Sequence, residues 1–366
     1  KMMKYEKNIG IAVICLLLLL GCGKEFLEEK PATDLNVPST LADLQMLLEN
    51  TSDFNSPSLG ELSSDDILLG DKEWNLQTKP YFAHSYVWSA DIFMGQGNIA
   101  DWNEPYAEIL ATNIALQQLD KLQRTPQNSA DYDNVKGMAL FKRAYAFFDL
   151  AQVFAMPFNE QTASTDWGIP LRLTADINAP NTRATLKATY EQILLDALNA
   201  KNLINIGYQK NYFNRPSKAA AYGFLSRVYL SLRDYQKAGS YADSALKIHA
   251  TLIDYNTIST TARSPFELLN NEQLYLKYLS SNDPMIRIYS TQGYGIDTLL
   301  YQSYHQDDLR KMIFFTKNGT TINKKGGYSG STGQENSIAT DELYLNRAEC
   351  YARSNKHEEA LSDLNT

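Results

Sequence analysis

The chain has 366 residues, of which 44% are hydrophobic and 21% are charged, and its formal net charge is −8. This length and apolar content allow one large domain or two small ones with a substantial core, and they exclude a chain that is disordered throughout. The acidic balance, without any cluster of Lys and Arg, argues against a nucleic-acid-binding protein, because phosphate recognition needs a basic surface.

Residues 1–21 have the order of a secretory signal peptide. Lysines precede an apolar run over 9–20, whose length of about a dozen residues is short of the roughly 20 that a membrane-spanning helix needs. The run ends at Leu19-Leu20-Gly21, directly before Cys22. A Cys in this position resembles a bacterial lipobox, so we expect cleavage before Cys22 and lipid attachment at its thiol. A short membrane anchor or a buried helix is the alternative for the apolar run, and an incidental thiol is the alternative for Cys22.

Residues 22–40 are predicted to form an extended tether, because Pro31 and Pro38 block helix formation. The remainder, 41–366, is expected to fold as one domain. It opens with a short helix at about Thr40–Glu49. Over 50–100, aromatic residues alternate with Gly, Asn, Asp and Ser, which is typical of loops and short strands.

Longer helices are predicted to begin near residue 102. Apolar and aromatic side chains recur at helical spacing over 102–116, 135–155 and 186–203. The second of these segments is the longest, and Pro157 is expected to end it.

The chain repeats itself at an offset of 122 residues. Five positions agree in both copies with the helix–turn–helix unit of tetratricopeptide repeats, in which small residues let two antiparallel helices approach closely. The matching pairs are Tyr222/Tyr344, Ser226/Ala348, Tyr229/Tyr351, Ala238/Ala360 and Ala242/Leu364. We therefore expect helical repeats over about 102–250 and 339–366, with two ordinary amphipathic helix pairs as the alternative.

Between the repeats, residues 255–335 are predicted to be an inserted region of loops with a β-hairpin. Two β-rich segments, 313–316 and 320–322, flank Asn318-Gly319, a pair that favours a type I′ turn. The Gly- and Ser-rich segment 326–333 is expected to be a mobile loop.

Several segments, taken in order and spacing, resemble the SusD/RagB family, although none of them is specific alone. They span residues 22–366 and are Phe26-Leu27-Glu28-Glu29-Lys30-Pro31, Trp102-Asn103-x-x-Tyr106-x-x-Ile109-x-x-x-Asn113, Gly137-x-Ala139-Leu140-Phe141-x-Arg143-Ala144-Tyr145, Arg215-Pro216-Ser217-Lys218 and Glu342-Leu343-Tyr344-Leu345-x-Arg347-Ala348-Glu349. The resemblance implies a mainly α fold with a tetratricopeptide-like helical-repeat scaffold and an inserted loop and β-hairpin region.

The same resemblance implies a function. SusD-like proteins of Bacteroidetes are outer-membrane lipoproteins facing the cell exterior that bind oligosaccharides or other nutrients and cover a SusC-like TonB-dependent transporter. Family members usually continue beyond the helix that ends at Thr366, so the chain looks truncated within a repeat. The alternative is a protein–protein interaction scaffold at the cell envelope, because helical repeats often bind peptides in a groove.

A sugar site needs flat aromatic rings for the C–H faces and polar groups for the hydroxyls. Two segments offer both, and they form one site only if the fold brings them together. Each ring has the alternative role of packing its loop on the core. The candidate ligand-binding residues are Asp66, Trp74, Tyr81, Tyr86 and Trp88 from the first segment and Tyr289 and Tyr294 from the inserted region.

We expect neither catalysis nor a metal or cofactor. The sequence lacks G-x-S-x-G, H-E-x-x-H, P-loop and G-x-G-x-x-G motifs, and the acidic segment at Asp65, Asp66 and Asp71 lacks EF-hand spacing. Beyond Cys15 and Cys22, only Cys350 remains, so no disulfide framework is predicted. A glycosidase stays open as an alternative, because its two carboxylates need no local motif.

Overall fold

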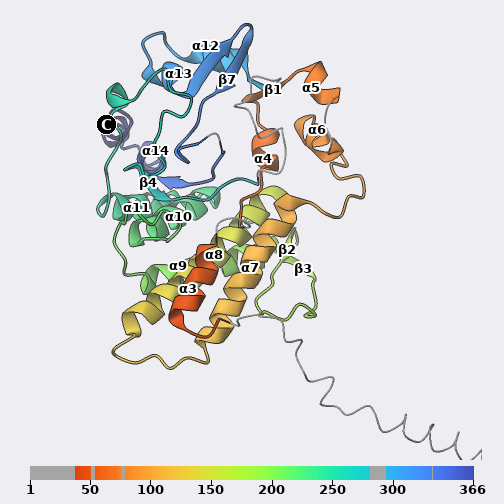
Figure 1. The fold of residues 1–366 in the computed structure, drawn as a ribbon, viewed down its shortest axis with the longest axis vertical. Helices are drawn as coiled ribbons and strands as arrows, with labels where there is room; N and C mark the ends of the chain where they lie inside the picture. The colour runs from red at the N-terminus through yellow and green to blue at the C-terminus, as the bar shows by residue number, and fades with distance from the viewer. Residues whose placement is uncertain (1–37, 51–53, 76–78, 281–293, 332) are drawn as a thin grey trace, which may run out of the picture. The chain divides into compact units, whose positions relative to one another are not determined.

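The computed structural model describes residues 38–366 apart from 51–53, 76–78, 281–293 and 332 (Figure 1). The chain divides into two units, Lys1–Pro38 and Ser39–Thr366, and the fold below is that of the second unit. The predicted signal peptide, Cys22 and nearly all of the tether lie outside the described residues. Across the part of the chain that is described, no helix combines the length and the apolar character needed to cross a bilayer.

Most of the second unit is helical, which confirms the expected fold class. Successive long helices pack on one another: α7 on α8, α8 on α9, α10 on α11, α11 on α14 and α14 on α15. Helix α3 (Leu41–Glu49) packs on α7 and α8. The helices of the series are α7 (Ala100–Leu119), α8 (Ser129–Phe154), α9 (Leu186–Leu203), α10 (Lys218–Ser231), α11 (Tyr235–Leu246), α14 (Thr340–Arg353) and α15 (His357–Leu364).

The predicted repeat is confirmed as two helix–turn–helix units, α10–α11 and α14–α15 (Figure 1). Their turns are equivalent as well, because the turn residues Arg233 and Asn355 have φ values of +61° and +59° and lie at the same 122-residue offset. In each turn the following residue closes the same backbone hydrogen bond, from Asp234 N to Tyr229 O at 3.0 Å and from Lys356 N to Tyr351 O at 2.9 Å. This is the hydrogen-bond pattern of a Schellman C-cap.

Short elements fill the remainder of the unit. The described strands form two-stranded antiparallel pairs: β1 (Ile67–Leu69) with β5 (Tyr294–Ile296), β2 (Trp167–Pro170) with β3 (Arg183–Thr185), β4 (Gln273–Tyr275) with β8 (Ile338–Ala339), and β6 (Phe315–Asn318) with β7 (Thr321–Lys324). The short helices are α4 (Leu59–Leu62), α5 (Asp71–Asn75), α6 (Pro80–Tyr86), η1 (Tyr255–Thr257), α12 (Thr298–Ser303) and α13 (Leu309–Phe314).

The structure refines three local expectations. The described part of residues 50–100 is mainly loop with the strand β1, as expected, but it also contains the short helices α4, α5 and α6. The hairpin exists, but its register pairs Asn318 with Thr321, so the turn is centred on Gly319-Thr320 and only Gly319 has a positive φ, of +61°. Part of the Gly- and Ser-rich segment packs on its neighbours, because the Tyr328 ring is buried against Phe266 at a centroid distance of 4.8 Å.

The long helix α8 is apolar on nearly every side and lies in the centre of the main core. Phe141, Tyr145 and Phe147 have no exposed surface. The ring of Tyr145 stacks on Phe224 of α10 with centroids 4.9 Å apart, and Phe141 meets Tyr275 of β4 edge to face at 4.9 Å. A helix that is buried all round has no single apolar face, so its core role follows from composition rather than periodicity.

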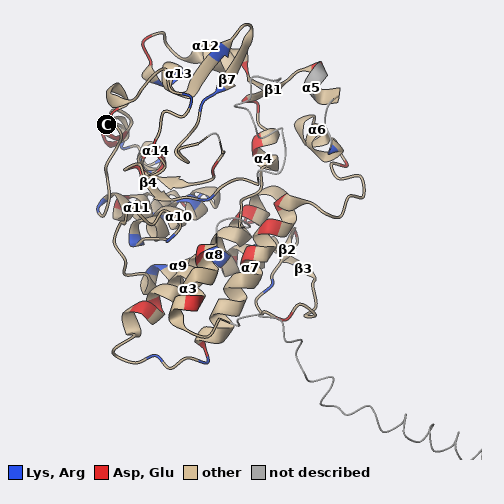
Figure 2. Ribbon diagram, in the orientation of Figure 1, with Lys and Arg blue, Asp and Glu red and all other residues tan. Residues whose placement is uncertain are grey.

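Charged residues also occur where α7 and α8 pack against neighbouring elements (Figure 2). The carboxylate of Glu108 on α7 accepts a hydrogen bond from Lys277 Nζ at 2.6 Å and lies 3.5 Å from Lys142 Nζ. Lys277 Nζ also lies 3.0 Å from the carboxylate of Asp149. All four side chains are at least nine-tenths buried. Burial lowers the pKa of Lys142 and raises the pKa of Asp149. We call these four residues the buried ion cluster.

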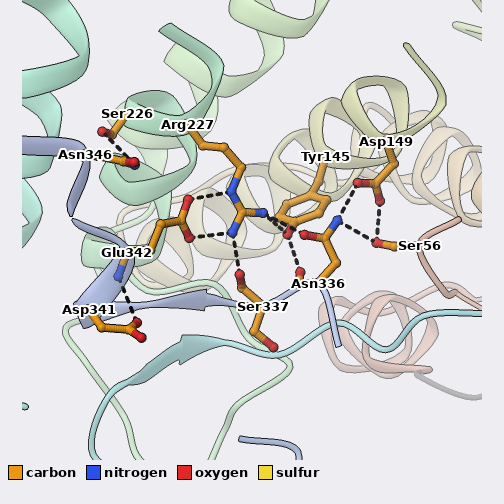
Figure 3. A network of polar contacts seen from close by, with 10 residues as sticks. All are labelled: Ser56, Tyr145, Asp149, Ser226, Arg227, Asn336, Ser337, Asp341, Glu342 and Asn346. Atoms are coloured by element: carbon orange, nitrogen blue, oxygen red, sulfur yellow. Dashed lines mark hydrogen bonds and ion pairs between the residues drawn. The ribbon is translucent and has the colours of Figure 1, made fainter. Parts of the chain in front are cut away.

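A second polar network adjoins this cluster and joins the two helical repeats to α8 through the segment before β8 (Figure 3). Arg227 of α10 binds both carboxylate oxygens of Glu342 of α14, at 2.7 and 2.5 Å, and donates to the Tyr145 hydroxyl at 2.6 Å. Asn336 accepts from that hydroxyl through its backbone oxygen and donates through its amide nitrogen to Asp149 at 2.9 Å. The polar chain therefore runs without interruption from α14 to the buried ion cluster.

Replacing Lys277 with Met is expected to lower the free energy of unfolding by about 3–5 kcal/mol, because Glu108 and Asp149 then remain buried without their shared cation. The control is Lys187→Met, which removes the same charge from an exposed position 4.0 Å from Glu191 and should cost under about 1 kcal/mol. Urea denaturation measures both. Equal losses for the two variants would show that the cluster contributes no more than a surface pair.

Arg233→Gly is expected to stabilise the fold by roughly 0.5–1 kcal/mol, because glycine removes the strain of a left-handed backbone at an exposed side chain. Arg233→Ala serves as the matched control, since it removes the same side chain but keeps the strain. Thermal unfolding of both variants measures the difference, and a melting temperature for the glycine variant no higher than that of the alanine variant contradicts the prediction.

Candidate functional site

The fold brings together the two segments in which ligand-binding residues are predicted. Strand β1 from the first segment pairs with β5 from the inserted region, so Ile67 faces Ile296 and Leu69 faces Tyr294. The backbone nitrogen of Asp297 also donates to Asp66 O at 2.9 Å. The backbones of the two aromatic segments therefore lie side by side, as a single site would require.

Among the predicted ligand-binding residues, Trp88 has a largely exposed ring, with 74% of its surface accessible. It follows α6 with a φ of +54°, a strained backbone conformation for a bulky residue. Its indole nitrogen donates to Ser63 O at 3.0 Å, which fixes the ring against the residue after α4. An exposed ring held in one orientation is a suitable platform for stacking.

Trp88 lies at the edge of a cavity of about 470 Å³. The apolar part of its wall comes from the loop after α6 and from the end of α8, and the polar part comes from hydroxyl and amide side chains. The lining residues are Leu59, Gly60, Ser63, Ser85, Trp88, Ser89, Ile92, Phe93, Gln152, Val153 and Pro157. We call this space the Trp88 cavity.

The helix α4 on one side of the cavity is held by a carboxylate from α7. Asp101 accepts hydrogen bonds from the backbone nitrogens of Ser58 and Leu59, at 2.5 and 2.9 Å, and from the Ser58 hydroxyl at 3.0 Å. Burial raises the pKa of Asp101, and these hydrogen bonds act in the opposite direction. The carboxylate thus satisfies the free amides at the start of α4, which has no side-chain cap of its own.

The part of the cavity wall that comes from the loop after α6 is supported by aromatic packing. Tyr81, which is 2% exposed, contacts Phe82 at a centroid distance of 4.2 Å and Phe93 at 6.2 Å. Phe93 in turn stacks on Phe154 at the end of α8, at 6.1 Å. Tyr81 therefore has no ring face on the surface, and it supports the cavity lining through Phe93.

The other predicted residues occupy different positions. Trp74 is half-buried and meets Tyr86 edge to face at 6.5 Å, and the Tyr86 hydroxyl accepts from Leu69 N at 3.2 Å, so both rings pack around β1. Asp66 is exposed directly before β1. Tyr294 begins β5, and Tyr289 lies outside the described residues.

Of the residues that line the Trp88 cavity, sequence reasoning predicted only Trp88, and it missed the contribution of α8 entirely. Gln152 and Val153 lie in the last turn of a helix whose remainder is core, and Pro157 follows its end. Nothing in their local pattern separates them from core positions, and only Pro157 carried a signal, that of a helix end. Within the described ranges, no group of three or more His, Cys, Asp or Glu side chains is arranged to hold a metal ion.

Described residues in the segments that carry the family resemblance serve packing in this structure. Arg143 binds both oxygens of Asp196 on α9, at 2.7 and 2.8 Å, and donates to Asn113 of α7 at 2.9 Å. A Cβ on Gly137 would lie 2.7 Å from the Ile204 side chain, so only glycine lets α8 approach the chain at that point. These residues define the scaffold on which the cavity is built.

Comparisons with known proteins agree with this scaffold. Residues 25–230 match the SusD-like_3 family, described as "Starch-binding associating with outer membrane". No curated protein matches the sequence.

Several solved structures share the fold. A SusD superfamily protein from Bacteroides thetaiotaomicron aligns with a TM-score of 0.70 at 21% identity, over 89% of this chain and 79% of that chain. A putative sugar binding protein from Bacteroides vulgatus aligns with a TM-score of 0.73 at 22% identity, over 90% and 78%. Surface glycan-binding protein A from Bacteroides uniformis aligns with a TM-score of 0.65 at 14% identity, over 89% and 79%.

At these identities the structures establish the fold, and the family assignment comes from the sequence match. That match extends over more than half of the chain and includes α7, α8, α9 and α10. The chain belongs to the SusD-like family.

Proposed function

We propose that this protein is a lipid-anchored protein of the outer cell surface that binds an oligosaccharide and delivers it to a SusC-like TonB-dependent transporter. Binding without chemical conversion is sufficient for this role. The observation that carries the proposal is the exposed, fixed ring of Trp88 beside a cavity with polar and apolar walls, in a chain of the SusD-like family.

The Trp88 cavity has the chemistry that a neutral saccharide needs. Its volume falls within the roughly 300–1,000 Å³ typical of small-ligand sites. Ile92, Phe93 and Val153 offer apolar contacts for C–H faces, while Ser89 and Gln152 offer groups that can bond hydroxyls. The sugar-binding and glycan-binding descriptions of two structural neighbours support a saccharide as the ligand.

The anchor and the transporter are proposed from the family resemblance. The family description places its members in association with the outer membrane, which agrees with lipid attachment at Cys22. Multiple acyl chains hold a protein stably at a membrane surface, whereas one chain binds only weakly. Moderate ligand affinity suits delivery, because tight complexes dissociate slowly.

Trp88→Ala is expected to weaken oligosaccharide binding about tenfold or more, which corresponds to about 1.4 kcal/mol of lost stacking energy. The ligand is first identified on a glycan array, and its affinity is then measured by isothermal titration calorimetry. Because the ring is mostly exposed, the melting temperature should change little. Unchanged affinity would remove Trp88 from the site.

The matched control for that experiment is Trp167→Ala. Trp167 is also mostly exposed, at 67%, but lies on β2 and does not line the Trp88 cavity. Its loss should leave glycan affinity unchanged. A peptide pull-down completes the design, because retention of peptides without any glycan would favour the interaction-scaffold alternative.

Cys22→Ser is expected to abolish acylation and to release the protein from the membrane fraction, because serine offers no thiol for lipid attachment. Incorporation of labelled palmitate and partitioning into detergent measure the two effects in a bacterial host that processes lipoproteins. The control is Cys350→Ser, at a buried thiol in α14 that should not affect labelling. Labelled, membrane-bound Cys22→Ser protein would contradict the proposed anchor.

A further inference from the structure

A second cavity, of about 520 Å³, lies in the inserted region and is strongly basic. None of its described lining residues is acidic, although the whole chain has a net charge of −8. Figure 2 shows Lys and Arg in blue along β7 and beside α12 and α13. The cationic lining residues, which define what we call the basic pocket, are Arg263, Lys311, Lys317, Lys324 and Lys325.

The hairpin register places two of these lysines on one face. Phe315 of β6 pairs directly with Lys324 of β7, and Lys317 lies two residues along β6 from Phe315. Side chains at i and i+2 of a strand, and those of directly paired residues, point to the same side of a sheet. Lys317 and Lys324 therefore share a face, and their like charges repel.

Lys325 brings a further charge into the wall of the pocket. Its side chain is more than nine-tenths buried, and Nζ donates to Thr260 O at 2.5 Å and to Met312 O at 2.8 Å. Both of these acceptors are uncharged carbonyls, and an ammonium has a third donor. Burial lowers the pKa of Lys325, the direction expected when desolvation dominates.

The contacts of Lys311 and Lys324 neutralise little of their positive charge. Lys311 donates to the uncharged Tyr304 O at 2.8 Å and lies 4.8 Å from the Tyr301 ring centroid. Lys324 lies 3.7 Å from Glu61 of α4, and because both side chains are about one-third exposed the attraction is weak. Positive charge from four lysines gathered at one cavity favours binding of an anion.

The rest of the lining indicates an anion carried on a larger molecule. Tyr301, Met312 and Phe315 give apolar surface, and Thr261 and Thr316 give hydroxyl groups. The cavity volume lies in the range of small-ligand sites, roughly 300–1,000 Å³, which is more space than an inorganic ion alone fills. Apolar walls, hydroxyls and cations together match a sugar ring that bears an acidic group.

We propose that the basic pocket binds the carboxylate or sulfate group of an acidic saccharide. The choice of a saccharide as the carrier rests on the proposed function. The preference for an anion is independent of the proposed function, because it rests on the four lysines of the pocket. The lysines recognise the negative charge, and the Tyr301 ring and the threonine hydroxyls contact the sugar.

The test compares ligands that differ only in charge. Isothermal titration calorimetry at low salt is carried out with a hexuronate trisaccharide, its sulfated neutral-sugar counterpart, the carboxyl-reduced trisaccharide, polyglutamate of equal charge and inorganic phosphate. At least one of the two acidic trisaccharides is expected to bind at least tenfold more tightly than the carboxyl-reduced one. Whether the uronate or the sulfate binds more tightly identifies the anionic group. Equal affinity for all three trisaccharides overturns the proposal.

The variant Lys317→Gln/Lys324→Gln is expected to remove that tenfold preference. Both side chains are at least partly exposed and lie on a surface hairpin, so folding is expected to be preserved. The control is Lys121→Gln/Lys187→Gln, which lowers the net charge equally at exposed sites away from the basic pocket and should keep the preference. Preference retained in the hairpin variant, or lost equally in the control, overturns the proposal.

The remaining outcomes separate this proposal from the proposed function. Phosphate or polyglutamate binding as tightly as the acidic trisaccharides would show a general anion or acidic-peptide site and would overturn the choice of a saccharide. Trp88→Ala should leave the preference for acidic over neutral trisaccharides intact. If a glycan array shows binding of neutral ligands only, the proposal for the basic pocket is wrong and the proposed function stands. If the array shows no binding of any glycan, both the proposal for the basic pocket and the proposed function are wrong.

Discussion

The buried ion cluster of Glu108, Lys142, Asp149 and Lys277 is the interaction on which the other parts of the fold depend. Ions removed from water cost several kcal/mol each unless they meet opposite charges with good geometry. Here α7 provides one carboxylate and α8 provides a lysine and the other carboxylate, while Lys277 comes from the inserted region. A shift of the inserted region relative to the helices would leave two buried carboxylates without Lys277. The cluster therefore fixes where the loops sit on the scaffold.

The same cluster positions the Trp88 cavity. Ser56 donates to Asp149 at 2.6 Å, and two residues later Ser58 enters the hydrogen bonds of Asp101 that begin α4. On α8, Gln152 and Val153 follow Asp149 within about one helical turn and form the opposite wall. Both sides of the cavity are thus connected within a few residues to one buried carboxylate. This arrangement links both walls of the cavity that Trp88 lines to the same buried carboxylate.

The scaffold was predictable from sequence because its signals are local and repeated. The 122-residue offset identified both repeats, and the same offset recurs in the turn residues Arg233 and Asn355. Helix α4 was missed because the carboxylate that caps its start, Asp101, lies 43 positions away from Ser58. Likewise, Tyr81 and Trp88 look alike in an aromatic segment. Only the packing of Tyr81 on Phe93 and the positive φ at Trp88 separate a buried ring from an exposed one.

The basic pocket shows why a net charge describes a binding surface poorly. Its cations are spread over residues 263–325, where no run of basic residues appears, and the hairpin and the loop at Thr260 gather them at one cavity. At physiological ionic strength, charges more than about 8 Å apart are largely screened. An acidic group inside the pocket therefore experiences mainly the nearby lysines rather than the net charge of the whole chain. A protein that is acidic overall can accordingly select an acidic ligand at one place.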